Sequence, residues 1–475
     1  MKKTISALML LVLLCLCACG QADIAPADAG TSVTGAEAGL AAALDEATAE
    51  PTAAPTTEVT AAPTAQPTAS DAASSTGTSR PAAAAKPPIH AAAAKTQKFS
   101  APAVGANDFA FRLGCALLAK NGNKNFVSSP YSVWLPLAAL VNATNSSQKP
   151  VLLNALGAAG FSEKELNDAT AQALYSLTDQ RKKELGSTYF HNPLHIANAI
   201  FVDKSATLNQ NFKKIFAESY LGSAQTVSFS SPDALKTIND WAEKNTGGLI
   251  KNILDTISPD AVAVIANAIY FSDRWEKEFN SEQTEQGKFN GTNGKTDAHF
   301  MLREGSGSYY EDEKLQAMPL TFQTGGTLHI LLPKNGSANS LLSSMTLDYF
   351  EKIQRDASQA KGTLLLPRFS IDSGEMKLID VLAALGIPLV DSSLSPLDGL
   401  TGEGALYISD ALQKAVIKVD EKGTTAAAVT AMTMKYGMAP SPQAGPFRMV
   451  CDKPFAFILC GSGGQILFTG VVNQI

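Results

Sequence analysis

The residues best suited to an unusual chemistry lie in the segment 421–432, directly after a predicted strand at Ala415–Val419. After the flexible Gly423, the side chains are no larger than threonine or valine until Met432. Neither a charge nor a proline lies between Thr424 and Lys435, so nothing there prevents pairing in a sheet. A loop with this composition can enter a sheet as an additional strand.

A strand points alternate side chains to opposite faces, which divides this segment into two sets. The set suited to burial is small at first and apolar later, and comprises Thr424, Ala426, Ala428, Thr430, Met432 and Met434. The second set contains the only charge and comprises Thr425, Ala427, Val429, Ala431, Thr433 and Lys435. The alternative is that the pattern belongs to an alanine-rich loop that never enters a sheet.

No signature of catalysis or metal binding accompanies this segment. The sequence has no G-x-S-x-G, H-E-x-x-H, Walker or G-x-G-x-x-G motif and only five histidines. It also lacks the C-x-x-C spacing of zinc sites. The residues therefore favour neither an enzyme nor a protein with a cofactor.

The segment resembles the proximal hinge of inhibitory serpins, a family of serine protease inhibitors. The family pattern is Glu, any residue, Gly, Thr, any residue, an alanine-rich run and Thr. The hinge residues here are Glu421, Gly423, Thr424, Thr425, Ala426, Ala427, Ala428 and Thr430. Further stretches resemble the family in chain order, namely Asn125–Ser132, Ile238–Trp241, Asn245–Ile250, Asn267–Phe271, Trp275–Phe279, Leu406–Ala415 and Asp452–Phe455.

The resemblance covers about 100–475 and implies an α+β fold. The family's fold has three β-sheets, eight to nine helices and an exposed reactive-centre loop. It also implies suicide inhibition, in which a protease cleaves the loop and forms an acyl-enzyme. The part of the loop before the cut then inserts into the central sheet, and the attached protease is distorted.

Family spacing implies a reactive bond after the seventeenth residue, counting Glu421 as the first, which is between Gly437 and Met438. A shift of one or two residues would make Tyr436 or Met438 the specificity residue. The other positions predicted to influence specificity precede the bond and are Met434, Lys435 and Tyr436. The three candidates Tyr436, Gly437 and Met438 are uncharged, so the expected targets are elastase-like, subtilisin-like or chymotrypsin-like proteases. A trypsin-like target would require cleavage after Lys435.

The resemblance also implies residues that control opening of the central sheet. The shutter would comprise Ser129, Ser132, Asn239 and Gln413. Trp275 would lie in the breach where the hinge enters, with Lys414 and Glu421 flanking it. Gln413 stands where many relatives have histidine. It can still donate and accept hydrogen bonds, but it loses the pH dependence of histidine. The serine hydroxyls could equally be helix caps.

The N-terminus resembles a bacterial lipoprotein signal. Two lysines precede an apolar stretch that ends in Leu16-Cys17-Ala18-Cys19-Gly20. This predicts a signal peptide at 1–18, a lipid on Cys19 and an anchor in the cell membrane. The alternatives are an ordinary secretory signal or a cytosolic apolar helix. Residues 19–95 are rich in Ala, Pro and Thr and are predicted to be a disordered linker.

Composition limits the remaining classes of function. The chain has 475 residues, 17% charged residues and a net charge of -6, so nothing indicates binding to nucleic acid.

Helices are predicted early, with Asn107 as a cap and a helix at Ser132–Val141. Strands dominate later, beginning with a buried strand at Ala261–Phe271. The later strands are Thr327–Leu332, Thr363–Leu366, Ala415–Val419, Phe455–Leu459 and Ile466–Val472.

The cysteines and histidines indicate neither a disulfide nor a metal site. Cys451 and Cys460 lie nine residues apart in a predicted strand, which is too far for their sulfurs to bridge. His191 and His195 have helical spacing, but Pro193 lies between them. We interpret both histidines as loop or core residues.

The leading hypothesis is a monomeric, lipid-anchored bacterial inhibitor of serine proteases. A second hypothesis is a non-inhibitory serpin that acts as a surface binding protein. A third is an inhibitor of a papain-like cysteine protease, which the loop sequence also allows.

Overall fold

The computed structural model describes residues 105–178, 194–246, 248, 250–258, 260–394, 396–401, 406–424 and 443–475. The chain divides into two units, Met1–Pro81 and Ala82–Ile475, and every described residue belongs to the second. The predicted signal peptide, Cys19 and most of the linker fall in the first unit, outside the described residues. Within the described residues, no helix is both long and apolar enough to cross a membrane.

Ten α-helices form within these residues, against the eight or nine expected. They are α2 (Ala106–Asn121), α3 (Pro130–Leu140), α4 (Lys149–Ala155), α5 (Glu163–Leu177), α7 (Gln210–Tyr220), α8 (Ala234–Asn245), α9 (Ala338–Ser343), α10 (Leu347–Asp356), α11 (Ile379–Ala384) and α12 (Asp398–Thr401). Local sequence explains several starts. Pro130 occupies the first turn of α3, and Ser162 and Glu165 form a capping box on α5.

The large sheet contains the strand that leads into the segment 421–432 and the first two strand residues of that segment, Gly423 and Thr424. Its strand order is β3 (Gly222–Val227), β2 (Leu194–Asp203), β4 (Ala263–Phe271), β13 (Asp410–Asp420), β14 (Gly423–Thr424) and β5 (Asp273–Arg274). The short strands β11 (Phe369–Asp372) and β12 (Met376–Lys377) also pair with β13. The buried strand predicted over 261–271 is confirmed as β4, and the strand predicted at Ala415–Val419 is part of β13.

The remaining strands form two sheets joined by β7. Their order is β1 (Phe126–Ser128), β17 (Ile466–Val472), β16 (Phe455–Cys460), β9 (Thr327–Pro333), β8 (Leu315–Thr321), β7 (Gly294–Glu311), β10 (Ser358–Pro367) and β15 (Gln443–Val450), with β6 (Glu285–Gly291) beside β7. Residues 300–309 of β7 pair with β10, while Tyr310 and Glu311 pair with β8. This change of partner along β7 yields the three sheets that were predicted.

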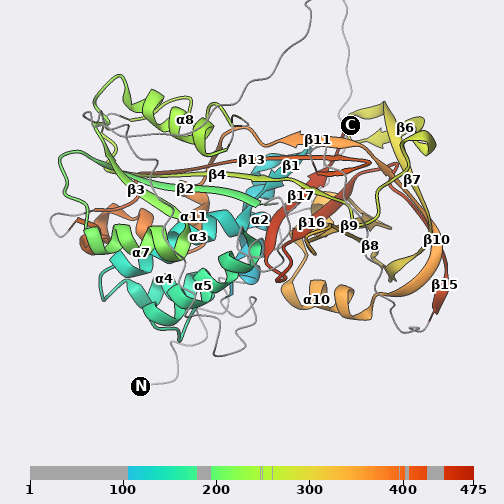
Figure 1. The fold of residues 1–475 in the computed structure, drawn as a ribbon, viewed down its shortest axis with the longest axis horizontal. Helices are drawn as coiled ribbons and strands as arrows, with labels where there is room; N and C mark the ends of the chain where they lie inside the picture. The colour runs from blue at the N-terminus through green and yellow to red at the C-terminus, as the bar shows by residue number, and fades with distance from the viewer. Residues whose placement is uncertain are drawn as a thin grey trace, which may run out of the picture. The chain divides into compact units, whose positions relative to one another are not determined.

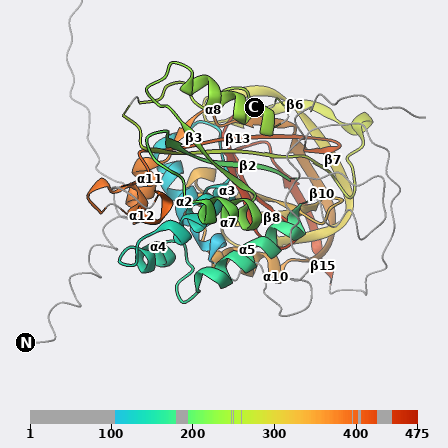
Figure 2. The same cartoon turned by 60° about the vertical axis from the view of Figure 1, so that its left-hand side comes forward.

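Helices cover both faces of the large sheet. In Figure 1, α8 lies on one face, while α2, α3 and α7 lie on the other. Every residue of α3 is buried, which fits its nearly continuous apolar sequence. Figure 2 shows α4, α5 and α7 gathered on the side of α3. The fold is therefore α+β, as predicted, with one apolar cluster on each face of the large sheet.

One predicted helix cap is wrong. α2 begins at Ala106, so Asn107 lies inside its first turn and Gly105 occupies the cap position. The Asn107 amide instead donates to the Gly464 carbonyl at 3.0 Å and accepts from the Ile466 N–H at 2.9 Å. It fastens α2 to the turn before β17, a distant contact that local spacing could not reveal.

Candidate functional site

The central feature of the large sheet is a parallel seam between β4 and β13. Residues 410–416 of β13 pair in parallel with 264–270 of β4. Each of these strands has an antiparallel neighbour on its other side, β2 for β4 and β11 for β13. A chain running opposite to both strands could therefore enter the seam and pair antiparallel on both of its edges.

The start of the candidate hinge already lies at one end of this seam. After β13 the chain turns at 421–422, and β14 pairs with β13 through Val419 opposite Thr424. On its other edge β14 pairs with β5, with Thr424 opposite Asp273. Thr424 is fully buried, and its hydroxyl accepts a hydrogen bond from the Asp273 N–H at 3.1 Å. Gly423 and Thr424 are thus already in strand form.

Gly423 is required at this turn for reasons of space and backbone conformation. Its φ of +149° lies in a region that side-chain-bearing residues rarely adopt. A Cβ at this position would lie 2.0 Å from the carbonyl oxygen of Asp273. Any other residue would push β14 away from β5.

Glu421 fixes the turn at the start of the hinge through an ion pair with Arg368, whose side chain is 45% exposed. The Glu421 side chain is 9% exposed and lies 2.6 Å from the Arg368 guanidinium, and the Thr284 hydroxyl donates to it at 2.6 Å. Burial acts to raise the pKa of Glu421, but the hydrogen bonds from Arg368 and Thr284 act in the opposite direction and leave it below its ordinary value. Glu421 therefore stays ionised at neutral pH.

Trp275, which the resemblance assigned to the breach, lies beside the same turn. Its indole N–H donates to the Asp420 carbonyl at 2.8 Å, and its backbone N–H donates to the Lys422 carbonyl at 2.8 Å. The ring is fully buried and stacks on Phe322 with centroids 4.4 Å apart. Trp275 therefore holds both ends of the turn through which the hinge would move.

A buried polar cluster lies beneath the middle of the seam. Gln413 is fully buried, and its Oε1 accepts from the Ser128 hydroxyl and the Ser129 N–H, each at 3.0 Å. Its Nε2 lies 2.7 Å from the Ser129 carbonyl, 3.1 Å from Ser132 Oγ and 3.0 Å from Asn267 Oδ1. Gln413 on β13 and Asn267 on β4 are register partners, so this contact bridges the seam directly.

The serines of the cluster do not cap α3. Ser129 stands at the N-cap position, but its hydroxyl donates to the Leu467 carbonyl on β17 at 2.6 Å. Ser132 donates to Asn267 Oδ1 at 2.6 Å. The Asn267 amide continues the chain of contacts to Asn198 on β2. Of the two alternatives left open by sequence, the contacts favour a role beneath the sheet.

Two of the predicted site residues lie elsewhere. Asn239 is on α8, where its Oδ1 accepts from the N–H groups of Ile253 and Leu254 and its amide donates to the Leu254 carbonyl. Lys414 follows Gln413 on β13 and faces Asp372 at 3.7 Å, six residues before the Asp420 that Trp275 contacts. Asn239 is therefore a loop anchor, and Lys414 is a mid-strand residue rather than a neighbour of Trp275.

Much of the predicted loop lies outside the described residues. This applies to Thr425, Ala426, Ala427, Ala428, Thr430, Met434, Lys435, Tyr436, Gly437 and Met438. Their predicted roles remain predictions from sequence. His191 is also outside, whereas His195 is on β2 with its ring 6.0 Å from that of Tyr270. Cys451 and Cys460 are buried free thiols.

Sequence reasoning missed Asn267, Ser128 and Arg368. Asn267 did have a signal, because a polar residue inside the buried strand 263–271 needs a hydrogen-bonding partner. Arg368 had none, since its partner Glu421 is 53 residues away. In the part of the chain that the structure describes, no group of three or more His, Cys, Asp or Glu residues is arranged to hold a metal ion.

The chain has a sheet with a parallel seam, a hairpin at the end of that seam and helices on both faces (Figure 1). Comparisons with known proteins identify the class to which this fold belongs. The family model for serpins (serine protease inhibitors) matches residues 104–475. The human plasma serine protease inhibitor is 30% identical over 373 residues, covering 77% of this chain and 88% of that protein. A serpin-like protein of Thermococcus kodakarensis is 31% identical over 376 residues, covering 78% and 85%.

The solved structure of human glycosylated kallistatin has the same fold. It aligns with a TM-score of 0.66 at 24% identity, over 79% of this chain and 98% of that one. The chain belongs to the serpin family, whose members are typically inhibitors of serine proteases rather than enzymes.

Proposed function

We propose that the protein inhibits serine proteases by trapping them as covalent complexes. A protease attacks the segment 425–442 as a substrate, and the residues after Thr424 then insert between β4 and β13. The observation that carries this proposal is the parallel seam, in a sheet whose neighbouring pairs are antiparallel, with β14 already at its end.

The register of β14 tells which residues would meet during insertion. Because Val419 lies opposite Thr424, a continued antiparallel ladder sets Ala426 opposite Ile417, Ala428 opposite Ala415 and Thr430 opposite Gln413. Ile417, Ala415 and Gln413 are buried on the face that α3 covers. The small side chains would therefore enter the core, and Thr430 would reach the polar cluster.

The energetic argument for insertion rests on strand pairing. The entering strand satisfies its N–H and C=O groups on two edges, and it replaces one parallel ladder by two antiparallel ones. The reverse change would again expose these groups, so the inserted state is favoured once cleavage frees the segment. The Gln413–Asn267 contact of 3.0 Å must be broken and its partners reassigned during opening.

The length of the segment fits this mechanism. From Thr424 to Gly437 there are thirteen residues, which span about 43 Å as a strand. After full insertion, a protease esterified at Gly437 would lie that distance along the sheet from Thr424, and trapping requires that it arrives there before it hydrolyses the bond. We propose Gly437–Met438 as the reactive bond, with elastase-like, subtilisin-like or chymotrypsin-like targets.

We further propose that the protein is exported by a bacterium and acts as a monomer at the outer face of the membrane. The lipoprotein-like signal that ends at Cys19 and the predicted linker at 19–95 support this placement. Replacing Cys19 by serine should abolish the lipid, which mass spectrometry of the expressed chain detects. A variant whose mass still includes the lipid and which still associates with the membrane would exclude Cys19 as the anchor.

The function is tested by incubating the protein with elastase, subtilisin, chymotrypsin and papain. We expect an SDS-resistant complex with at least one of the three serine proteases, and mass spectrometry of the released peptide locates the cut. The cleaved protein should unfold at a higher temperature than the intact one. Clean cleavage that leaves all proteases active, without a rise in melting temperature, would instead identify a non-inhibitory serpin.

A further inference from the structure

The end of the seam that lies farthest from β14 is closed by Ser409. The regular parallel ladder of β13 with β4 begins with Asp410 opposite Val264, and Ser409 lies one residue before it. The Ser409 N–H and hydroxyl both donate to the Ala263 carbonyl at 2.9 Å. The same hydroxyl oxygen accepts from the N–H groups of Val262 at 3.1 Å and Ala263 at 3.4 Å. One residue therefore makes four hydrogen bonds across the seam.

The hydroxyl of Ser409 supplies three of these four contacts. Without it, the N–H groups of Val262 and Ala263 would lose this acceptor. Ala263 is fully buried, so water could not replace the serine oxygen at its N–H. A buried donor left without a partner costs more than an ordinary hydrogen bond contributes. The hydroxyl therefore stabilises the closed form of the seam at this end.

The two sides of this contact are anchored to different parts of the fold. Directly before Ser409, the Ile408 N–H donates to the Leu389 carbonyl at 2.7 Å. On the other side of the seam, the Val262 carbonyl accepts from the Asp203 N–H at the end of β2, at 3.2 Å. Widening of the seam at this end therefore separates two anchored strand ends and breaks the contacts of Ser409.

The register that β14 begins tells when the inserting segment would reach this contact. In a continued antiparallel ladder, Thr433 lies opposite Asp410 and Met434 lies opposite Ser409. Up to Thr433, the segment replaces only the ordinary backbone pairs of β4 with β13. Met434 would lie between Ser409 and Ala263, so it pairs only after the Ser409 contacts have broken.

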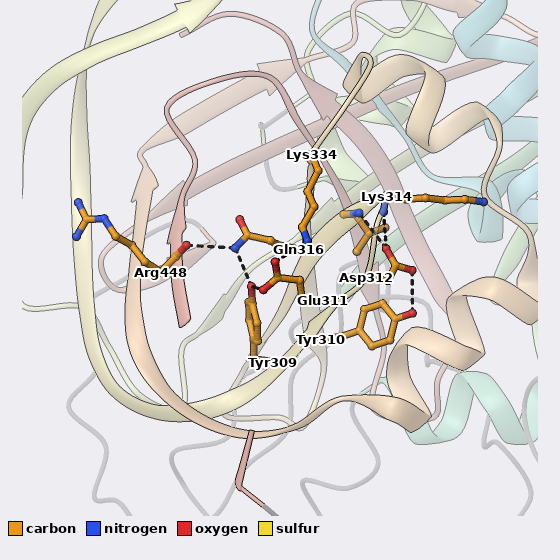
Figure 3. Close-up of polar contacts among 9 residues, drawn as sticks. Tyr309, Tyr310, Glu311, Asp312, Lys314, Gln316, Lys334 and Arg448 are labelled. Carbon is orange, nitrogen blue, oxygen red and sulfur yellow. Dashed lines mark hydrogen bonds and ion pairs between the residues drawn. The ribbon is translucent and has the colours of Figure 1, made fainter. Parts of the chain in front are cut away.

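Another side chain that joins separate strands shows why the position of Ser409 matters. Figure 3 shows Gln316 of β8, whose amide donates to the Tyr309 hydroxyl at 2.7 Å and to the Arg448 carbonyl on β15 at 3.2 Å. β8 and β15 are separated in the strand order by β7 and β10, and the proposed mechanism inserts nothing between them. The contacts of Gln316 can remain throughout the reaction, whereas those of Ser409 lie in the path of the inserting strand.

We propose that Ser409 is a positioning residue that divides insertion into two stages. In the first stage the segment enters as far as Thr433. In the second stage the Ser409 contacts break, and residues 434–437 enter. The inference rests on the proposed function, because it concerns the protease esterified at Gly437.

The second stage decides between trapping and escape. While the Ser409 contacts hold, residues 434–437 remain outside the sheet, and the protease is about 13 Å short of its final position. During this time water can add to the Gly437 carbonyl and break the ester, which leaves a carboxylate on Gly437 and restores the serine hydroxyl of the protease. Faster release of Ser409 therefore leaves less time for hydrolysis.

The first measurement tests the contact in the intact protein, without a protease. Amide hydrogen exchange is compared in Ser409→Ala and in the matched control Ser373→Ala. The Ser373 hydroxyl accepts from the Ala415 N–H at 3.0 Å on the other edge of β13, away from the seam. Residues 264–266 and 411–413 should exchange about three- to thirtyfold faster in Ser409→Ala, with no change in β16. No acceleration, or equal acceleration in Ser373→Ala or in β16, would overturn the proposal.

The second measurement tests the role of Ser409 in the reaction. Cleaved inhibitor and covalent complex are quantified on SDS gels, at a temperature at which the unaltered protein gives both. In Ser409→Ala the ratio of cleaved inhibitor to complex should fall at least about threefold, because the seam opens faster. Ser409→Thr keeps the hydroxyl and should restore the ratio. If Ser409→Ala does not fold, Ser409→Cys takes its place in both measurements, because sulfur is a weak acceptor.

The direction of the change separates the proposed role from a structural one. A variant that is only destabilised would give less complex, not more. An unchanged or higher ratio in Ser409→Ala would overturn the role of Ser409 and leave the proposed function standing. Absence of any complex with the unaltered protein would overturn the proposed function, while hydrogen exchange still decides whether Ser409 holds the seam closed.

Discussion

The seam between β4 and β13 differs from the pairing of β16 with β17 in what fills the space under the strands. β16 and β17 are antiparallel to each other and buried at every residue, and β16 is also antiparallel to β9. The seam is parallel, and a cluster of amides and hydroxyls lies beneath it. Apolar contacts in β16 and β17 are lost outright if those strands separate.

Hydrogen bonds behave differently when strands part, because they can be exchanged for others of similar energy. Gln413 and Asn267 have several alternative donors and acceptors within reach, including those of Ser129 and Ser132. A polar cluster under a parallel pair therefore lowers the free energy needed to open the sheet at that place. Under the proposed mechanism, the fold would therefore open at the seam between β4 and β13 and stay closed between β16 and β17.

The largest expected effect comes from placing a charge on the face that the seam would bury. Ala426→Glu would set a carboxylate opposite Ile417, which is 1% exposed, so insertion would bury an unpaired charge. The yield of covalent complex per cleaved inhibitor should fall at least about tenfold, measured on SDS gels. Thr425→Glu is the matched control, since its carboxylate would face exposed Lys418 and the yield should be retained. Equal losses in both variants would contradict the inferred register.

The next effect is at the turn that leads into the seam. Arg368→Ala removes the partner of nearly buried Glu421 and should lower the free energy of unfolding by about 1 to 3 kcal/mol in urea. The folded pKa of Glu421 is below its unfolded value, so this contribution is present above about pH 4.3. The difference in stability between the unaltered protein and Arg368→Ala should shrink as the pH falls through the folded pKa of Glu421, because Glu421 is then neutral in both proteins.

Arg355→Ala serves as the comparison for that variant. Arg355 is 68% exposed and pairs with Asp356 at the surface, so its loss should change stability by less than about 0.5 kcal/mol. A difference between the two arginine variants of under 0.5 kcal/mol would mean that the Glu421 turn contributes no more than an ordinary surface ion pair.

A smaller effect is expected from restoring the residue that many relatives have in the polar cluster. In Gln413→His the imidazole would be buried, so its pKa in the folded state would lie below the unfolded value of about 6.5. The unfolded chain then takes up the proton first, and stability falls as the pH drops. We expect the variant to lose about 1 to 2 kcal/mol relative to the unaltered protein between pH 7 and pH 5 in urea unfolding.

The unaltered protein is an essential reference for this experiment. It already contains His329, whose pKa burial lowers to about 4, so its own stability also falls in acid. Only the difference between the two proteins in how the free energy of unfolding depends on pH reports on position 413. A constant difference across this pH range would mean that the imidazole is solvated or paired by the cluster.

The helices and strands with long apolar runs could be predicted from sequence, but contacts between residues that are distant in the sequence could not. The strand over 263–271 and the hinge pattern at 421–424 follow from side-chain size and alternation, which are local properties. The pairing of Arg368 with Glu421 depends on how distant strands come together. The resemblance assigned Asn239 to the cluster, whereas the contacts place Asn267 there.

The smallest expected effect tests whether Asn267, rather than Asn239, belongs to the polar cluster. Asn239→Ala removes hydrogen bonds to a loop, and should cost about 1 kcal/mol of stability without changing the yield of covalent complex. Asn267→Ala should lower stability and also change the yield, because Asn267 contacts Gln413 across the seam. If Asn239→Ala altered the yield as much as Asn267→Ala, control of opening would extend to α8, which packs on β2 and β4, and would not be confined to the cluster.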